Sequence, residues 1–333
     1  MTEPQEILWE YDKVEIGQAS PAFTIEVTAE LIGRYVNAVR NPNPVYQVSE
    51  GHSPGSDLLA MPTMVIRIAP GSRTDIAANN GYVALEAAKE NRRQTPFAKC
   101  EVRWFAPLTA GDIITSFAHV VDKYERRGNK FVTYRTEATN QHGLKIAEHD
   151  YTTIFEYAKG QHTREESAQP TAQTSGRNSP KENPRPVNTE PLDFKSFAVG
   201  TELPPFTICE TQETINASGI NIMDRPPRPN LHTDEEFAKR SLFGGTANSG
   251  ATTMSYVNQM LEARFPAGAF YNGGRLLHKA VRPFRPGDTV TFTGTVTNKR
   301  EEDNRKMVEC EVKGYNQLGQ LMGISEATVI LAN

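Results

Sequence analysis

Cysteine is scarce in this chain, and long apolar runs are missing. Its three cysteines, Cys100, Cys209 and Cys310, are scattered through strand-like stretches. An odd, dispersed set forms neither a disulfide framework nor a metal motif, so we expect free thiols in a reducing, cytoplasmic setting. No run approaches the roughly 20 apolar residues needed to cross a bilayer, and residues 1–17 lack the apolar core of a secretory signal. We therefore expect neither a membrane segment nor secretion.

An excess of charge of one sign is missing too. Lys and Arg number 36 against 40 Asp and Glu, which gives a net charge of −4 and no reason to expect nucleic acid as a partner. The histidines show no zinc-ligand spacing, so no metal and no separate cofactor are predicted. The stretch "GTANSGAT" (245–252) has Ala251 where a phosphate-binding loop needs lysine. Ser249 does not lie in a nucleophile elbow of the Gly-x-Ser-x-Gly type either, since positions 247 and 251 are both alanine.

A polar stretch divides the chain into two similar halves. Residues 158–192 are rich in Ser, Thr, Gln, Asn and Pro, which predicts a flexible linker between domains at 1–157 and 193–333. "EIGQASPAFTI" (15–25) matches "AVGTELPPFTI" (198–208), and "NQHG" (140–143) matches "NQLG" (316–319). A Gly-Asp pair also recurs in both halves before a strand-like run. Three anchors in the same order indicate a duplicated domain.

Each half has the same coarse pattern of elements. A short strand is predicted at 23–27 and again at 206–209, followed by a helix such as that at 28–40, where apolar residues recur at helical spacing. A second helix is predicted at 251–265. Long alternating stretches with charged turns close each half, as antiparallel strands do. Early helices and late strands predict an α+β fold in each half.

The arrangement resembles the MaoC-like (R-hydratase 2) branch of the hot-dog fold. The resemblance covers both halves and is strongest over 228–293, where "NLHTDEEFA" and "VRPFRPGD" occur in family order. It implies two tandem hot-dog domains, each an antiparallel sheet wrapped around a long central helix, paired as an intramolecular pseudo-dimer. It also implies addition of water to an acyl thioester, or its removal. The family carries an Asp-x-Asn-Pro-x-His motif in the loop before the central helix.

The motif fits the two halves differently. In "NPNPVY" the motif positions are Asn41, which cannot accept a proton, and Tyr46, which is a poor base near neutral pH, so this copy is predicted to be inactive. In the second half His232 matches the histidine. The offset between the repeats places Asp224 at the aspartate position, in a loop longer by three residues. Asp234 is the alternative carboxylate, although its place in "HTDEEFA" favours a helix start.

The resemblance assigns further roles around this pair. His232 and Asp224 would share a water, and the backbone amide of Gly250 at the start of the central helix would bind the thioester oxygen. Candidate substrate-binding residues are Asn230, Ser249, Asn248 and Arg228. Arg225, Arg228 and Lys239 are candidates for contacts with coenzyme A.

In double-hot-dog relatives the degenerate copy widens the pocket for a bulky acyl chain. The excess sequence at 47–95 is the candidate for such remodelling here. Within it, "LLAMPTMVIRIA" (58–69) fits an acyl channel, a core helix or a core strand equally well.

The resulting expectation is a hydratase or dehydratase acting on an acyl thioester, carried by coenzyme A or a carrier protein. Two other functions stay open: a non-catalytic acyl-CoA-binding or partner subunit of the same fold, and an acyl-CoA thioesterase. A thioesterase would need a carboxylate near the thioester, and none occurs at 251–256. A homodimer of such chains is also conceivable.

Overall fold

Both halves of the chain join in one antiparallel sheet of ten strands. The computed structural model describes residues 6–47, 58–90, 92–157, 182, 194–219, 230–241, 243–302 and 305–331. The strand order is β1-β3-β4-β5-β2-β7-β10-β9-β8-β6, so the first five positions come from the first half and the rest from the second. The strands are β1 (Phe23–Glu26), β2 (Phe97–Trp104), β3 (Ile113–Arg126), β4 (Asn129–Thr139), β5 (Lys145–Glu156), β6 (Glu202–Cys209), β7 (Arg275–Ala280), β8 (Thr289–Glu302), β9 (Arg305–Asn316) and β10 (Leu321–Leu331).

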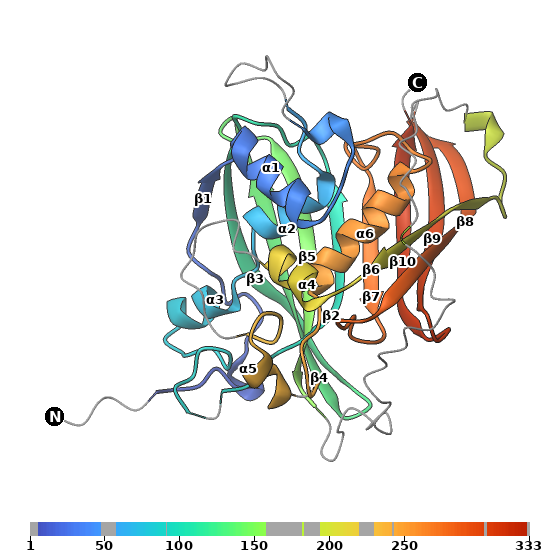
Figure 1. Ribbon diagram of the computed structural model, residues 1–333. Coiled ribbons are helices and arrows are strands. Elements are labelled where there is room, and N and C mark those ends of the chain that lie inside the picture. The colour runs from blue at the N-terminus through green and yellow to red at the C-terminus, as the bar shows by residue number, and fades with distance from the viewer. Residues whose placement is uncertain are drawn as a thin grey trace.

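The seam between the halves is the pairing of β2 with β7. These strands run antiparallel, with Cys100 opposite His278 and Lys99 opposite Lys279. Each half contributes one strand, so backbone hydrogen bonds cross from one repeat to the other along the middle of the sheet (Figure 1). The predicted intramolecular pseudo-dimer of two hot-dog units is confirmed.

The repeated sequence anchors are turn residues with matching hydrogen bonds. Asp112 accepts a hydrogen bond from the amide of Thr109, and Asp288 accepts one from the amide of Arg285. The glycine before each aspartate has a φ near +90°, a conformation that only glycine adopts without strain. Asn140 and Asn316 each accept two backbone amides in their own hairpins. The two halves are therefore most alike in sequence at the turns, where the backbone geometry requires particular residues.

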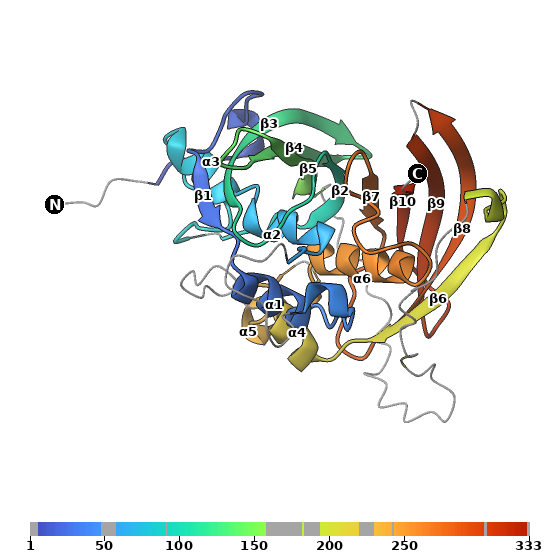
Figure 2. The same ribbon diagram turned by 90° about the horizontal axis from the view of Figure 1, so that it is seen from above.

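Helices occupy the concave face of the sheet and its ends (Figure 2). The central helix of the second half is α6 (Gly250–Glu262), and most of its residues are buried. The short preceding helices are α1 (Ala29–Ala38) in the first half and α4 (Gln212–Gly219) in the second. The remaining helical elements are η1 (Tyr11–Lys13), η2 (Pro44–Tyr46), η3 (Pro62–Met64), α2 (Val65–Ile68), α3 (Arg73–Asn79), η4 (Phe194–Ser196) and α5 (Glu235–Lys239).

The two halves differ most in their central helices. The expectation of a long central helix in each copy is wrong for the first half, where the corresponding place holds η3 and the four-residue α2. Residues 58–69 are almost entirely buried and belong to the same apolar core as α6. The stretch "LLAMPTMVIRIA" is therefore core. Pro62 stands at the first helical position, where proline is tolerated, and Pro70 follows shortly after α2, where a helix cannot easily continue.

Other expectations match the structure closely. The first predicted strand and helix appear as β1 and α1, and the predicted helix at 251–265 appears as α6. All three cysteines lie in strands and are free thiols. The linker expected at 158–192 lies outside the described residues except for Glu182, so the domain boundaries stay predictions.

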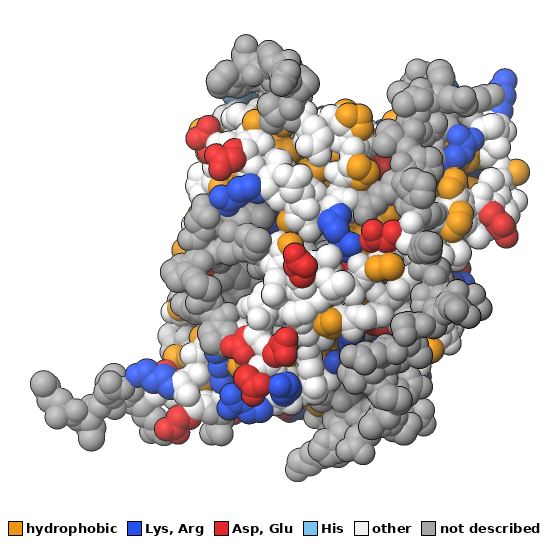
Figure 3. Space-filling model, viewed as in Figure 1, with side chains coloured by type: hydrophobic (Ala, Val, Ile, Leu, Met, Phe, Trp, Pro, Cys, Tyr) orange, Lys and Arg blue, Asp and Glu red, His pale blue; other side chains and the backbone are white. Residues whose placement is uncertain are grey.

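The described surface carries charges of both signs. Lys, Arg, Asp and Glu side chains are intermingled over the face shown in Figure 3. Within the described residues, no helix combines the length and the apolar character that crossing a membrane requires.

Candidate active site

The imidazole of His232 is fixed by the loop that carries it. The side chain of Asn230 accepts hydrogen bonds from the backbone amides of His232 (2.8 Å) and Thr233 (3.1 Å). On the other side, Nδ1 of His232 lies 2.7 Å from the carbonyl oxygen of Ala247. Asn230, a candidate for substrate binding, therefore shapes the loop that carries His232.

These contacts define the protonation state of His232. A carbonyl oxygen can only accept, so Nδ1 carries the proton and Nε2 keeps its lone pair. Burial, with smaller contributions from the nearby cations Arg67 and Arg73, lowers the pKa of His232 to about 4. The imidazole is thus neutral near pH 7, with Nε2 available as a proton acceptor.

Helix α6 starts at the same site. Its N-cap is Ser249, whose hydroxyl accepts the amide of Thr252 and lies 2.6 Å from the guanidinium of Arg67. Gly250 is the first helical residue, so its N–H has no partner within the helix. A free N–H at the positive end of a helix dipole is suited to bind a developing negative charge. Ser249 was expected to bind substrate, but it does not line the cavity and instead fixes the helix start.

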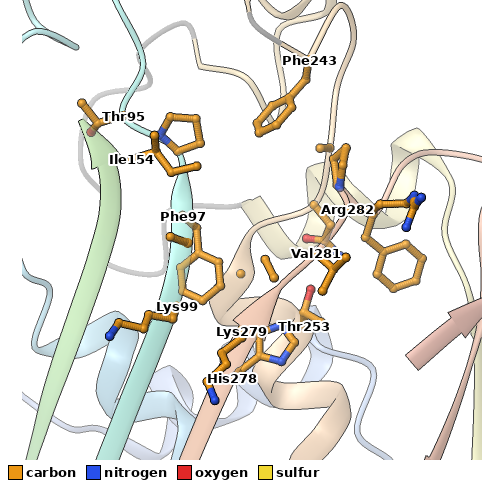
Figure 4. A pocket seen from close by; sticks show the side chains of 18 of the residues that line it. Thr95, Phe97, Lys99, Ile154, Phe243, Thr253, His278, Lys279, Val281 and Arg282 are labelled. Carbon is orange, nitrogen blue, oxygen red and sulfur yellow. The ribbon is translucent and has the colours of Figure 1, made fainter. Parts of the chain in front are cut away.

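His232 and Gly250 line one cavity of about 520 Å³. Phe97, at the start of β2, lies inside it, between the ends of the seam strands and the start of α6 (Figure 4). A Cβ atom at position 250 would overlap the Phe97 ring, so only glycine fits between the ring and the helix. The lining comes from both halves of the chain, and the cavity is therefore a product of the pseudo-dimer.

Asn248 lines this cavity and connects it to a buried polar network. Its amide donates to the carboxylate of Glu210 (2.8 Å), while its Oδ1 accepts the backbone N–H of Ser249 (2.7 Å). Tyr256 of α6 and Arg40 of the first half also donate to Glu210, whose side chain is fully buried. Asn248 therefore positions the start of α6, and its own amide is already hydrogen-bonded.

The motif positions of the first half meet at one carboxylate. Tyr46 donates to Oε1 of Glu262 at 2.5 Å and Asn41 donates to Oε2 at 3.0 Å. Glu262 belongs to the last turn of α6, so the first copy's motif loop binds the far end of the second copy's central helix. Both donors are buried, and their polar atoms are bound within the protein. The geometry shows that this loop brings its first and sixth positions to a single point.

The aspartate proposed for the active copy lies outside the described residues, as do Arg225 and Arg228. The offset between the repeats can be followed within the described residues that precede this loop. Thr28 caps α1 by accepting the amide three residues on, and Thr211 accepts the amide of Thr214 in the same way. The offset between the copies thus holds up to the start of α4, the helix that leads toward Asp224.

Asp234, the alternative carboxylate, has a structural role. It is the N-cap of α5, and its Oδ1 accepts the amide of Phe237 at 2.9 Å. Lys239 pairs with Glu236 on the exposed side of the same helix and does not line the cavity. Basic residues do line the cavity, but they are different ones: Arg73, Lys99, Arg126, Lys279 and Arg282. No Asp or Glu occurs among the described lining residues, which favours a negatively charged ligand.

Sequence reasoning missed three residues of this site: Phe97, Arg67 and His278. Phe97 and His278 come together only through the seam between β2 and β7, where their rings stack at 5.9 Å. Arg67 reaches α6 from the first half, out of a stretch that reads as apolar core. The only signals were a single arginine in "MVIRIA" and a histidine in "RLLHKA", which are too weak without the pairing of the strands.

Two family profiles match the chain. A FAS1-like dehydratase domain region matches residues 15–149, and a MaoC like domain matches residues 228–316. Among curated proteins, a UPF0336 protein of Saccharopolyspora erythraea is 27% identical over 129 residues, which cover 38% of this chain and 78% of that protein.

Solved structures of similar fold span nearly the whole chain. A MaoC-like dehydratase superposes with a TM-score of 0.69 at 16% identity, covering 95% of this chain and 98% of the other. A MaoC domain protein dehydratase from Chloroflexus aurantiacus gives 0.65 at 12% identity, covering 99% of both chains. A Mycobacterium tuberculosis protein described as having a double hotdog fold gives 0.61 at 12% identity, covering 96% and 98%. At these identities the structures show a shared fold.

Proposed function

We propose that this chain, with its double hot-dog fold and its matches to a FAS1-like dehydratase region and a MaoC like domain, hydrates a 2-enoyl thioester or dehydrates the 3-hydroxyacyl product. The observation that carries this proposal is the shared cavity of His232 and Gly250. His232 offers an unprotonated Nε2, and Gly250 offers a backbone N–H that has no partner within its own helix. Base and oxyanion donor are the two groups that the reaction requires.

In the hydration direction, His232 Nε2 and the Asp224 carboxylate hold one water between them. The base removes a proton from this water as its oxygen bonds to the β-carbon, and the π electrons shift onto the thioester oxygen. The N–H of Gly250, aligned with the dipole of α6, stabilises that enolate. The proton then passes to the α-carbon, which restores the carbonyl. Dehydration reverses every step.

The cavity lining supports a negatively charged carrier. Arg126, Lys279 and Arg282 are exposed lining residues, and phosphates of coenzyme A or of a phosphopantetheine group would meet them at the surface. We therefore assign the acyl group to the buried end of the cavity and the carrier to the exposed end.

A turnover assay tests the proposal. Purified protein is incubated with crotonyl-CoA, octenoyl-CoA and bulkier enoyl-CoA thioesters, and loss of enoyl absorbance is followed. We expect His232→Ala and Asp224→Asn to lower kcat by about 100-fold or more, as removal of an acid-base group typically does. Asp234→Asn is the matched control, because asparagine caps a helix about as well as aspartate. An active Asp224→Asn beside an inactive Asp234→Asn would show that the repeat alignment is wrong.

The alternative functions give different results in the same assay. Binding of acyl-CoA without turnover of any substrate would identify a non-catalytic acyl-binding subunit. Thioesterase activity would appear as release of free coenzyme A thiol. It is disfavoured because Glu262, the carboxylate of α6, lies at the opposite end of the helix from Gly250 and is bound by Tyr46 and Asn41.

A further inference from the structure

His278 is a buried histidine in the cavity wall that the proposed chemistry does not use. It lies on β7 at the seam, opposite Cys100 of β2 and Ser325 of β10, and it is 2% exposed. Its Nδ1 lies 2.9 Å from the hydroxyl of Ser325. The ring faces the space beside Phe97 and Thr253 (Figure 4).

The imidazole of His278 is held in one orientation by its neighbours. Phe97 stacks on its face with an interplanar angle of 15°. Gly323 leaves room for its edge, since a Cβ there would lie 2.6 Å from Cε1 of the ring. A side chain confined this closely loses little further entropy when it binds a ligand.

One nitrogen of this ring is left over. Nε2 has no hydrogen-bond partner among the described residues, and it is not one of their fully enclosed unpaired polar atoms, so it is accessible from the cavity that His278 lines. Burial lowers the pKa of His278 to about 4, so the ring is neutral near pH 7. The Ser325 hydroxyl can either donate to Nδ1 or accept from it, so Nε2 is free to act as donor or acceptor.

The position of His278 in the cavity indicates which part of the substrate it meets. Arg126 and Arg282 mark the exposed end, where the proposed carrier enters. His278 lies at the buried end, beside Thr253, one turn into α6 from Gly250. The apolar lining beside His278 includes Phe97, whose ring stacks on the imidazole.

We propose that Nε2 of His278 hydrogen-bonds a neutral oxygen, a hydroxyl or ketone, on the acyl chain beyond the reacting carbons, and so makes the enzyme prefer oxygenated over plain alkyl thioesters. This inference rests on the proposed function. A neutral imidazole supplies no charge to balance a carboxylate, which is why an uncharged oxygen fits. An alkyl chain would leave Nε2 unpaired, and discrimination against a substrate that lacks a hydrogen-bonding group is the stronger kind of specificity.

The test compares matched substrates. Rates are measured with 2-octenoyl-CoA and with analogues that carry one hydroxyl or ketone on successive carbons beyond the double bond. Wild type is expected to favour at least one oxygenated analogue by roughly 10- to 100-fold in kcat/KM, in line with one hydrogen bond. His278→Phe, which keeps the stack on Phe97, should abolish this preference while retaining activity on octenoyl-CoA. His278→Gln, which keeps a hydrogen-bonding group, should retain part of it.

Two results would overturn the inference. One is an equal loss of kcat/KM with every substrate in His278→Phe, and the other is a wild-type preference for the unsubstituted alkyl chain. Circular dichroism of each variant checks folding, and His278→Gln carries the comparison if His278→Phe is unfolded. If wild type turns over none of the thioesters, the proposed function fails separately. The same preference is then measured by calorimetry, as relative affinity for the saturated 3-hydroxyoctanoyl-CoA and its oxygenated analogues.

Discussion

Gly250 occupies the tightest place in the cavity. Alanine there keeps the backbone N–H but puts a methyl group into the ring of Phe97. We expect Gly250→Ala to destabilise the protein by about 1–3 kcal/mol, as overpacking does, and to lower kcat by displacing the helix start. Denaturant titration and the turnover assay measure the two effects.

Two further variants separate the clash from helix propensity. Gly33→Ala in α1 meets no atom within 4 Å, so it should be stabilising by about 0.5–1 kcal/mol. Adding Phe97→Ala to Gly250→Ala should recover stability relative to the Gly250→Ala variant. If the double variant is no more stable than Gly250→Ala, the Phe97 ring does not clash with the added methyl group.

Histidines whose pKa is lowered by burial, His149, His232 and His278 among them, make the protein sensitive to acid. Burial lowers the pKa values of His232 and His278 to about 4, against 6.5 for an exposed histidine. Unfolding at lower pH therefore takes up protons, so the stability contributed by the neutral rings is present above pH 6.5 and is lost as pH falls toward 4. NMR titration of labelled histidine, assigned with His232→Gln and His278→Gln, should show midpoints well below 6.5. Midpoints near 6.5 in the folded chain would contradict this.

At the level of elements, the start of α6 depends on a cation from the other half. Arg67 of α2 contacts the hydroxyls of Ser249 (2.6 Å) and Thr252 (2.9 Å), although a positive charge at a helix N-terminus opposes the helix dipole. Its field also helps to keep His232 uncharged. Arg67→Met is therefore expected to raise the pKa of His232, while changing stability by no more than about 1 kcal/mol.

Arg67→Lys is the control, because it keeps the charge while losing the planar donor group. The same NMR titration reads both variants, and kcat/KM against pH gives an independent measure. An unchanged His232 titration in Arg67→Met would leave Arg67 with a capping role alone.

The elements also show which features of the structure can be predicted from the sequence. Strands with regular alternation, the helix α6 and the glycine-aspartate turns are predictable because their signals are local. His232 and Gly250 were identified through a motif. Phe97 and His278 were not, because their meeting depends on β2 pairing with β7 across most of the chain. The first half's missing long helix was hidden because 58–69 is apolar on all sides.

Across the whole molecule, the first half supports the central helix of the second half. Tyr46 of the first half donates to Glu262 of α6, and burial raises the pKa of that carboxyl group. Tyr46→Phe removes a donor from a buried acid and should destabilise the protein by about 1–3 kcal/mol. Tyr35→Phe is the matched control. It removes a hydroxyl that bonds only Thr63 among the described residues, a neutral partner, so its cost should be smaller.

Urea denaturation of both variants compares these costs. Glu262→Gln in the Tyr46→Phe background should reduce the loss, since the amide no longer needs a strong donor. Equal losses of unfolding free energy in Tyr46→Phe and Tyr35→Phe would mean that the hydrogen bond to the carboxylate stabilises the protein no more than one to a neutral partner.

The seam between β2 and β7 has a consequence for attempts to shorten the protein to its second half. The second half expressed alone would present β7 as a bare edge, a template for aggregation, and would leave Glu262 without Tyr46 and Asn41. Its substrate cavity would also lack the wall that Phe97 supplies. The second half is therefore not a separable module. A version made as two polypeptides should work only when both are produced together and reassemble along that edge.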